Sequence, residues 1–333
     1  MREGFSAELV CPACGGDTLL DIQHRDEAEV TGGRLSCQRC HAEYAVHKGV
    51  PRMRIGMDVD GIEEVADSFT HEWKAHHAGQ LESDTVFGRT QEEDWQVFTD
   101  GTRIGDAELA GMRVLDVGCG SGRLTRQIAE RGAALVVGAD INEAVDEVFE
   151  RTRDLDHLQV VQANLFALPF APQGFDLVWS CGVIHHTPDT RAAFQALTKH
   201  VRSGGVLFVW VYPKRFNPFR YTKDALDKIG LRRLSPAAIL RLSKAIAYPS
   251  VFLHRLYRGI RSIRPLRPRT EFGERTVRPR TLAEIQMTWN DALSPRFDAR
   301  HTEREVVEWF LSAGYSDVSV MGEPKIGVRG VAP

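Results

Sequence analysis

A glycine-rich turn between a short apolar strand and a helix constrains the fold of this chain more than any other feature. The segment Val114–Gly122 reads VLDVGCGSG, and it joins an expected strand over 113–117 to an expected helix over 121–131. Glycines in such a turn let the backbone bend tightly and approach a bound ligand closely. The turn therefore predicts a ligand site at the carboxyl end of a strand in an α/β fold.

The residues around this turn narrow the class of ligand. A dinucleotide site prefers the spacing G-x-G-x-x-G, whereas here the third glycine, Gly122, comes one position early. Asp116 lies two residues before Gly118, where it would repel a pyrophosphate but could hold an ammonium group. Asp140 ends the next expected strand, where a carboxylate can accept hydrogen bonds from both ribose hydroxyls. The pattern favours a nucleoside that carries an amino-acid tail.

The pattern after Met112 alternates between strands and helices, which predicts a doubly wound α/β fold: a mostly parallel sheet with helices on both faces. Near the end of the chain, Thr302-Glu-Arg-Glu305 forms a capping box that opens a helix to about Ala313, and a strand is expected near 317–321. The other strands are expected over 113–117, 134–139, 160–162, 175–180 and 206–212, and further helices over 121–131 and 190–201.

These motifs, taken in order, resemble the class I S-adenosylmethionine-dependent methyltransferases, in particular those of type 11. The resemblance implies a Rossmann-like sheet of seven strands and S-adenosylmethionine as the methyl donor. Residues 283–320 fit more loosely, as the last strands of such a sheet. The matching segments are Val114–Gly122, Gly138–Asp140, Gln162–Phe170, Phe175–Trp179, Gly182–Asp189 and Gly204–Gly205.

The resemblance also implies roles for single residues. The glycines of the turn would surround the methionine moiety, with Asp116 near its amino group, and Asp140 would bind the ribose. Asn164 stands where the family usually has an aspartate that contacts the adenine amine, and asparagine keeps an acceptor oxygen for that contact. Leu165 would offer its backbone N–H to the adenine ring. The expected cofactor-binding residues are Asp116, Gly118, Gly120, Gly122, Asp140, Ile141, Asn164 and Leu165.

Three residues at the ends of the fourth and fifth expected strands are candidates for catalysis. Methyl transfer from a sulfonium depends mainly on alignment, and a base is needed only when the acceptor must lose a proton. His185 and His186 follow the fourth strand at its carboxyl end, where such sheets bind ligands, although one of them could simply cap the turn before Pro188. Tyr212 ends the fifth strand on the same rim, with a packing role as the alternative.

Two pairs of cysteines in the first forty residues predict a structural zinc site, in a unit that looks like the zinc-ribbon modules found beside some methyltransferases. Each C-x-x-C turn presents two thiolates, and four thiolates suit tetrahedral Zn²⁺. A unit of this size buries little core, so a metal would supply the missing stability. A redox dithiol is the alternative, but it needs a thioredoxin-like frame that this sequence lacks. The expected ligands are Cys11, Cys14, Cys37 and Cys40.

The formal net charge of −3 hides a strongly basic segment. Residues 213–280 carry 18 Lys and Arg against 4 Asp and Glu, a net +14, so the rest of the chain carries −17. Within this segment, 236–260 could form a helix on a membrane surface or an apolar lid, and the arginines that follow could bind phosphates. A solvated surface that offsets an acidic body within a dimer is the third interpretation. We favour a lid that selects an acceptor bearing phosphate or carboxylate.

The sequence divides into five expected parts. These are a zinc ribbon over 1–56, a helical segment that covers the cofactor over 57–111, a cofactor-binding core over 112–212, the basic helical insertion over 213–280, and the completion of the sheet over 281–333. The aromatic residues of the second part are expected to be packing residues: Phe69, Trp73, Trp95 and Phe98.

The expected function is methyl transfer to oxygen or carbon of a small or amphipathic acceptor. Methylation of tRNA or rRNA is the alternative, but the arginine-rich stretch has few aromatic residues for base stacking. A non-catalytic scaffold is less favoured, because Asp116 and Asp140 are both present. The polar start of the chain and the lack of a long uncharged apolar run lead us to expect a cytoplasmic protein. Peripheral membrane contact and a homodimer are left open.

Overall fold

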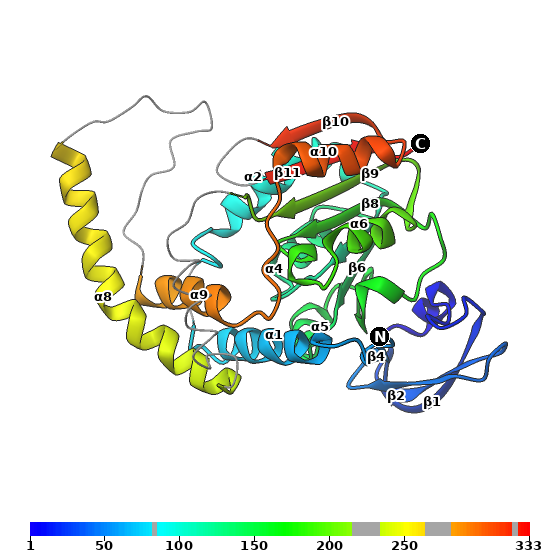
Figure 1. Ribbon diagram of the computed structural model, residues 1–333. Helices are drawn as coiled ribbons and strands as arrows, with labels where there is room; N and C mark the ends of the chain where they lie inside the picture. Colours follow the sequence, from blue (N-terminus) through cyan, green and yellow to red (C-terminus); the bar gives the residue numbers. More distant parts are fainter. Residues whose placement is uncertain (82–84, 215–233, 264–280, 322–325) are drawn as a thin grey trace.

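The computed structural model describes residues 1–81, 85–214, 234–263, 281–321 and 326–333. Much of the expected basic lid, with its arginines from Arg264 to Arg280, lies outside these residues. One sheet of eleven strands runs through the described part of the chain (Figure 1). In spatial order its strands are β1 (Thr18–Asp26), β2 (Glu29–Cys37), β3 (Glu43–His47), β4 (Val50–Met53), β7 (Leu158–Ala163), β6 (Leu135–Asp140), β5 (Arg113–Val117), β8 (Phe175–Cys181), β9 (Val201–Val211), β11 (Ile326–Val331) and β10 (Ser316–Met321).

The last seven strands of this order form the predicted doubly wound sheet, which confirms the fold class. β7, β6, β5, β8 and β9 are parallel, and β11 inserts antiparallel between β9 and β10. The strand order reverses between β5 and β8, which is where such sheets bind ligands. The sequence pattern did not predict β11, because its two glycines, Gly327 and Gly330, weaken the strand pattern.

The helices lie on both faces of the sheet and beyond its carboxyl ends (Figure 1). Their bounds, with short 3₁₀ turns marked η, are η1 (Glu3–Glu8), α1 (Ile62–His77), α2 (Gln91–Thr102), α3 (Asp106–Leu109), α4 (Arg123–Glu130), α5 (Val145–Thr152), η2 (Leu165–Ala167), η3 (Ile184–His186), α6 (Thr190–Thr198), α8 (Pro236–Ile263), α9 (Leu282–Leu293) and α10 (Glu303–Ser312).

Alternate residues of the strands point into two cores, one on each face of the sheet. Val114 and Val136 belong to a core with buried side chains of α2, α4 and α5. Leu115 and Val137 belong to the other core, which contains side chains of α6, α10 and the N-terminal unit. Burial on both faces is the reason that these strands read as continuous apolar runs.

The N-terminal unit joins the main sheet directly. Its strand β4 pairs in parallel with β7, so that Arg52 lies opposite Gln162. The amino group of Met1 is buried in the junction and donates to the carbonyl oxygens of Val30 at 3.1 Å and Gly49 at 2.7 Å. This shared edge could not be predicted from the sequence, because a four-residue strand carries little pattern of its own.

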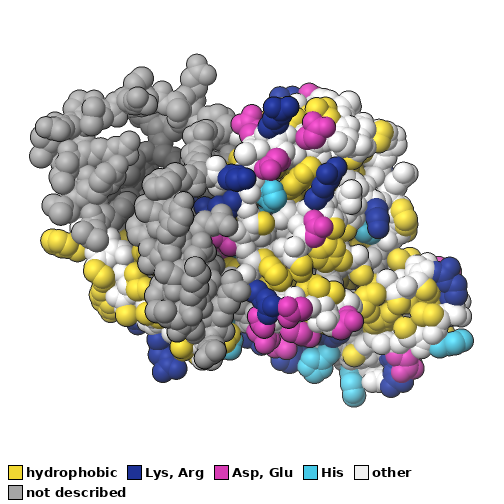
Figure 2. Space-filling model, in the orientation of Figure 1, with side chains coloured by type: hydrophobic (Ala, Val, Ile, Leu, Met, Phe, Trp, Pro, Cys, Tyr) yellow, Lys and Arg dark blue, Asp and Glu magenta, His cyan; other side chains and the backbone are white. Residues whose placement is uncertain are grey.

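Helices α1, α8 and α9 form a group at the carboxyl ends of the strands. The indole Nε1 of Trp289 on α9 donates to Ser250 Oγ of α8 at 3.0 Å, and Asn290 donates to Glu72 of α1 at 3.0 Å. Figure 2 shows hydrophobic side chains along α8, where Tyr248 and Phe252 are 59% and 68% exposed. Of the helices within the described residues, none combines the length and apolar character needed to cross a bilayer.

Candidate active site

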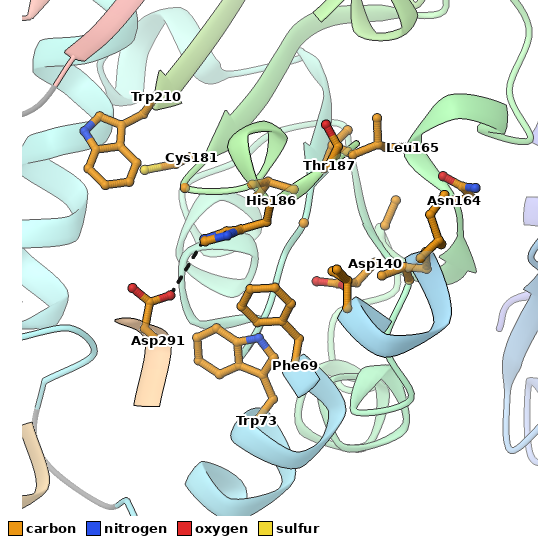
Figure 3. Close-up of a pocket in the computed structure, with 18 of the residues that line it drawn as sticks. Phe69, Trp73, Asp140, Asn164, Leu165, Cys181, His186, Thr187, Trp210 and Asp291 are labelled. Atoms are coloured by element: carbon orange, nitrogen blue, oxygen red, sulfur yellow. Dashed lines mark ion pairs between the residues drawn. The ribbon is translucent and has the colours of Figure 1, made fainter. Parts of the chain in front are cut away.

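A cavity of about 330 Å³ opens at the carboxyl ends of β5, β6, β7, β8 and β9. Its volume lies at the lower end of the range usual for small-molecule sites. Helix α1 covers it with Phe69 and Trp73, and α9 contributes Thr288 and Asp291 (Figure 3). Seven of the predicted site residues line this one cavity: Gly118, Asp140, Ile141, Asn164, Leu165, His186 and Tyr212.

The glycine-rich turn forms the floor of the cavity. Gly118 has φ +77°, and a Cβ there would come within 2.2 Å of the Val183 side chain, so only glycine fits. The backbone N–H of Gly120 donates to Asp140 Oδ2 at 2.9 Å, and this bond ties the turn to the end of β6. Gly120 and Gly122 do not belong to the cavity lining; they face Trp73 and Val148 respectively.

Asp140 is placed to accept hydrogen bonds from a ligand. Besides the bond from Gly120, its Oδ1 accepts from the backbone N–H of Asn142 at 3.2 Å. Burial raises the pKa of this carboxyl, while the backbone bonds from Gly120 and Asn142 oppose the rise. Each carboxylate oxygen keeps further acceptor capacity toward the cavity.

Asp116 lies behind the turn and does not line the cavity. Its Oδ2 accepts from the Thr125 hydroxyl at 2.6 Å, so the carboxyl joins β5 to helix α4. Burial, assisted by the charge of Asp140, raises the pKa of Asp116 to about 7. The predicted contact between Asp116 and an ammonium group stays a prediction.

The loop after β7 forms one end of the cavity. The side-chain oxygen of Asn164 accepts from the backbone N–H of Phe166 at 3.1 Å, and its amide nitrogen donates to the carbonyl of Ile55 at 3.0 Å. Asn164 thus holds the loop that carries Leu165 and connects it to the segment that follows β4. Its expected contact with an adenine amine stays a prediction, as does that of the Leu165 backbone.

His186, Asp291 and Tyr212 converge at the other end of the cavity. His186 Nδ1 lies 2.9 Å from the carbonyl oxygen of Phe297, which requires the proton of a neutral ring to be on Nδ1 and leaves the lone pair on Nε2. Nε2 lies 3.8 Å from Asp291 Oδ1 (Figure 3). The Tyr212 hydroxyl donates to Asp291 Oδ2 in a short hydrogen bond. Burial and the neighbouring Asp291 raise the pKa of Tyr212, so its hydroxyl stays protonated.

A second carboxyl lies behind Asp291. Glu72 is fully buried and accepts from the Asn290 side chain at 3.0 Å. Burial raises the pKa of Glu72 well above its usual value, and the charge of Asp291 raises it further. Burial therefore favours the protonated form of Glu72.

His185 differs in position from its neighbour His186. It is completely buried, and its ring centroid lies 4.1 Å from that of Tyr212, behind the cavity wall. Of the two adjacent histidines, only His186 reaches the cavity lining.

Four cysteines of the N-terminal unit meet in a compact cluster. The sulfurs of Cys11 and Cys40 lie 3.6 Å apart, those of Cys14 and Cys37 lie 3.5 Å apart, and all four fall within 4.8 Å of one another. Sulfurs bound to zinc at about 2.3 Å in a tetrahedron are about 3.8 Å apart. The backbone N–H groups of Arg39 and Cys40 each donate to the Cys37 sulfur at 3.4 Å, which stabilises a thiolate. The donor set fits Zn²⁺.

A protein-family model described as a methyltransferase domain matches residues 115–209, the segment that contains the turn, Asp140, Asn164 and His186. This chain contains a class I methyltransferase domain. The methyltransferase domain resembles a ubiquinone biosynthesis O-methyltransferase from Neisseria meningitidis, with 35% identity over 121 residues that cover 35% of this chain and 50% of the relative. The protein of the same name from Idiomarina loihiensis is 37% identical over 163 residues, 44% of this chain and 66% of the relative.

The chain thus spans about half the length of the curated relatives it matches first. Among solved structures, a magnesium protoporphyrin IX methyltransferase from Synechocystis PCC 6803 aligns with 84% of this chain and 100% of its own, at 15% identity and a TM-score of 0.46.

Several residues of the cavity were not predicted as site residues. Phe69 and Trp73 are packing residues, as expected, but they also line the cavity. Arg89 and Asp291 were missed altogether. Phe69 and Trp73 are four residues apart on one helix, a weak signal for a shared face. No pattern in the sequence marks Asp291, which lies 79 residues beyond its partner Tyr212.

Proposed function

We propose that this protein is an S-adenosylmethionine-dependent methyltransferase that acts on a hydroxyl oxygen of a small acceptor. The observation that carries the proposal is the arrangement of one cavity, with Asp140 at the nucleoside end and His186 at the acceptor end. The bound cofactor would supply an electrophilic methyl group on a sulfonium. The names of the relatives, which are O-methyltransferases, support oxygen as the acceptor atom.

The residues present fit the cofactor. Gly118 leaves room for close approach of a ligand to the backbone, and the Asp140 carboxylate is held by two backbone N–H groups for the ribose hydroxyls. Ile141 and Leu165 also line the cavity and offer apolar surface for the adenine ring. We assign cofactor binding to these residues together with Asn164.

His186 is the proposed general base. Its Nε2 would accept the proton that the acceptor hydroxyl loses when it takes the methyl group, with S-adenosylhomocysteine as the leaving group. The resulting imidazolium is stabilised by the carbonyl oxygen of Phe297 at Nδ1 and by the carboxylate of Asp291 beside Nε2. Tyr212 holds Asp291 in place through its hydroxyl.

The acceptor is proposed to be aromatic or amphipathic, with an anionic group. Phe69, Trp73, Phe87 and Trp210 line the cavity and suit an apolar body. The net +14 of residues 213–280 supports an anionic acceptor. We keep the five-part organisation of the chain as part of the proposal, with residues 213–280 as the lid that selects the acceptor.

The four clustered cysteines are proposed to hold a structural Zn²⁺. The sulfur separations of 3.5 and 3.6 Å support this assignment.

Methyl transfer to matched acceptors tests the proposed function. Zinc-loaded protein is incubated with labelled S-adenosylmethionine and either 3,4-dihydroxybenzoate or its dimethyl ether. We expect label to enter only the compound with free hydroxyls. A set of amine acceptors is tested in parallel. Equal labelling of both benzoates, or labelling of the amines alone, would contradict a hydroxyl acceptor.

A further inference from the structure

A chain of hydrogen-bonded side chains connects the N-terminal unit to the turn that follows Asp140. The pairing of β4 with β7 places Arg52 opposite Gln162, near the carboxyl ends of both strands. Arg52 Nη1 donates to Gln162 Oε1 at 3.2 Å. The amide nitrogen of Gln162 donates in turn to the carbonyl oxygens of Ile141 at 3.1 Å and Asn142 at 3.2 Å. Both carbonyls belong to the turn directly after Asp140.

Arg52 determines which end of the Gln162 amide faces this turn. The Gln162 side chain is only 4% exposed, so its amide group depends on protein partners. A reversed amide would direct its oxygen at two carbonyl oxygens and its NH₂ group at a guanidinium, which has no acceptor atom. The orientation that serves the turn is therefore the one that Arg52 stabilises.

The guanidinium of Arg52 is itself held from a second side. Its Nη2 contacts Asp146 of α5 in a short ion pair and donates to the carbonyl oxygen of His47 at 3.2 Å. A guanidinium presents several N–H donors in one plane, so it can serve Asp146 and Gln162 together, whereas an ammonium acts as a point charge. Lys48 pairs with the same Asp146 at 3.3 Å, but its side chain is 62% exposed.

The turn that this chain holds is part of the proposed cofactor site. Asp140 and Ile141 line the cavity, and the backbone N–H of Asn142 donates to Asp140 Oδ1 at 3.2 Å. Arg54, directly after β4, also donates to the Ile141 carbonyl, at 3.4 Å. Side chains of the N-terminal unit therefore fix the backbone that orients the Asp140 carboxylate, and a site fixed before binding loses less free energy when the ligand binds.

We propose that Arg52 is a positioning residue for the cofactor, which fixes the turn after Asp140 through Gln162 and so gives the N-terminal unit a part in cofactor binding. Arg52 does not belong to the cavity lining, so it acts through these other residues. The proposal rests on the proposed function, because it assumes that the cavity binds the nucleoside of S-adenosylmethionine.

A set of variants separates positioning from simple ion pairing. Arg52→Met removes both contacts, whereas Arg52→Lys keeps a positive charge for Asp146 and loses the planar group that also serves Gln162. Gln162→Leu removes the amide, alone and in a double variant with Arg52→Met. Lys48→Met is the matched control, because it takes a cation from the same Asp146 and leaves the Gln162 amide with its partners.

Titration calorimetry with S-adenosylhomocysteine and 5′-methylthioadenosine measures the effect on the zinc-loaded full chain. We expect Arg52→Met and Arg52→Lys each to weaken both ligands about tenfold, and Lys48→Met to leave both unchanged. The double variant should bind no more weakly than Gln162→Leu alone, because Arg52 acts through that amide. Thermal unfolding without ligand confirms that each variant folds, and Arg52→Lys carries the test if Arg52→Met does not fold.

Three results would overturn the proposal: unchanged affinity in the Arg52 variants, full recovery of affinity in Arg52→Lys, or additive losses in the double variant. Full recovery in Arg52→Lys would mean that only the charge beside Asp146 matters. Failure of the wild type to bind either nucleoside would instead overturn the proposed function.

Discussion

At the scale of single residues, the acceptor end of the cavity depends on where two adjacent histidines point. His186 reaches the cavity with Nε2 beside Asp291, whereas His185 packs behind Tyr212. The pair therefore offers an internal comparison, since both side chains are buried and only one faces the proposed acceptor.

We expect His186→Gln to lower kcat for a hydroxyl acceptor by about 100-fold or more, because His186 is the one histidine among the described residues that line the cavity. Affinity for S-adenosylhomocysteine should not change, since Gly118 and Asp140 are untouched. Steady-state kinetics and calorimetry measure both quantities. His185→Gln is the matched variant, and it should affect stability more than kcat. A larger loss of kcat in His185→Gln than in His186→Gln would contradict the assignment.

His200 makes the stability of the fold depend on pH. Burial lowers its pKa from 6.5 to about 4, although a hydrogen bond involving Ala171 opposes the change. Below pH 6.5 the unfolded chain binds a proton at this position, whereas the folded protein does not until about pH 4. The free energy of unfolding should therefore fall as the pH drops through this window, by about 3 kcal/mol at most.

Urea unfolding at pH 7.5 and pH 5 measures the effect. His200→Gln should lose less stability than wild type between these values, and the exposed His24→Gln serves as control. If the free energy of unfolding depends on pH in the same way in wild type and His200→Gln, burial of the His200 ring does not cause the pH dependence.

At the scale of elements, the capping box of α10 was predicted from the sequence and confirmed by the structure. Thr302 accepts from the backbone N–H of Glu305 at 3.2 Å, and the Glu305 carboxylate accepts from the backbone N–H of Thr302. Such caps depend on residues three positions apart, which is why a short sequence motif was sufficient. Helix α1 was expected only as part of the helical segment over 57–111 that covers the cofactor, and no motif marked its cavity-facing side chains Phe69 and Trp73.

We expect Thr302→Ala to lower the free energy of unfolding by about 1 kcal/mol, because the first turn of α10 loses its side-chain cap. Thr198→Ala, at the carboxyl end of α6, is the control and should lower the free energy of unfolding by less. Chemical denaturation measures both variants. Equal effects of the two substitutions would mean that the cap contributes nothing beyond an ordinary surface hydroxyl.

At the scale of the whole molecule, the N-terminal unit and the methyltransferase domain share one sheet and one core. The backbone N–H of Val10 donates to the carbonyl of Pro169 at 3.0 Å, and Asn164 donates to Ile55. Both contacts end on the loop that borders the proposed adenine position. If the structure around the four cysteines is lost, the loop at the proposed cofactor site should therefore lose two of the contacts that hold it.

Removal of zinc is expected to destabilise the entire described fold in one transition and to weaken S-adenosylhomocysteine binding. Scanning calorimetry with and without a strong chelator measures the first effect, and titration measures the second. Cys14→Ser should reproduce both. Two separate transitions, with cofactor binding intact after the first, would contradict the coupling between the two units.

The sequence predicted those features that depend on neighbouring residues: the glycine turn, Asp140, the alternation of strands and helices, and the two cysteine pairs. It could not place Arg89 and Asp291, because each reaches the cavity from a segment far along the chain from the glycine turn or from Tyr212. The junction between β4 and β7 was missed for the same reason, since backbone pairing at an edge leaves no residue-type pattern.

Binding of S-adenosylhomocysteine to the zinc-loaded full chain tests the central claim most directly. Titration calorimetry is performed on wild type and on Asp140→Asn, with Asp154→Asn as an exposed control. The account predicts one site per chain in the wild type, binding weakened about tenfold or more in Asp140→Asn, and no change in the control. A folded wild type that binds no S-adenosylhomocysteine would contradict it.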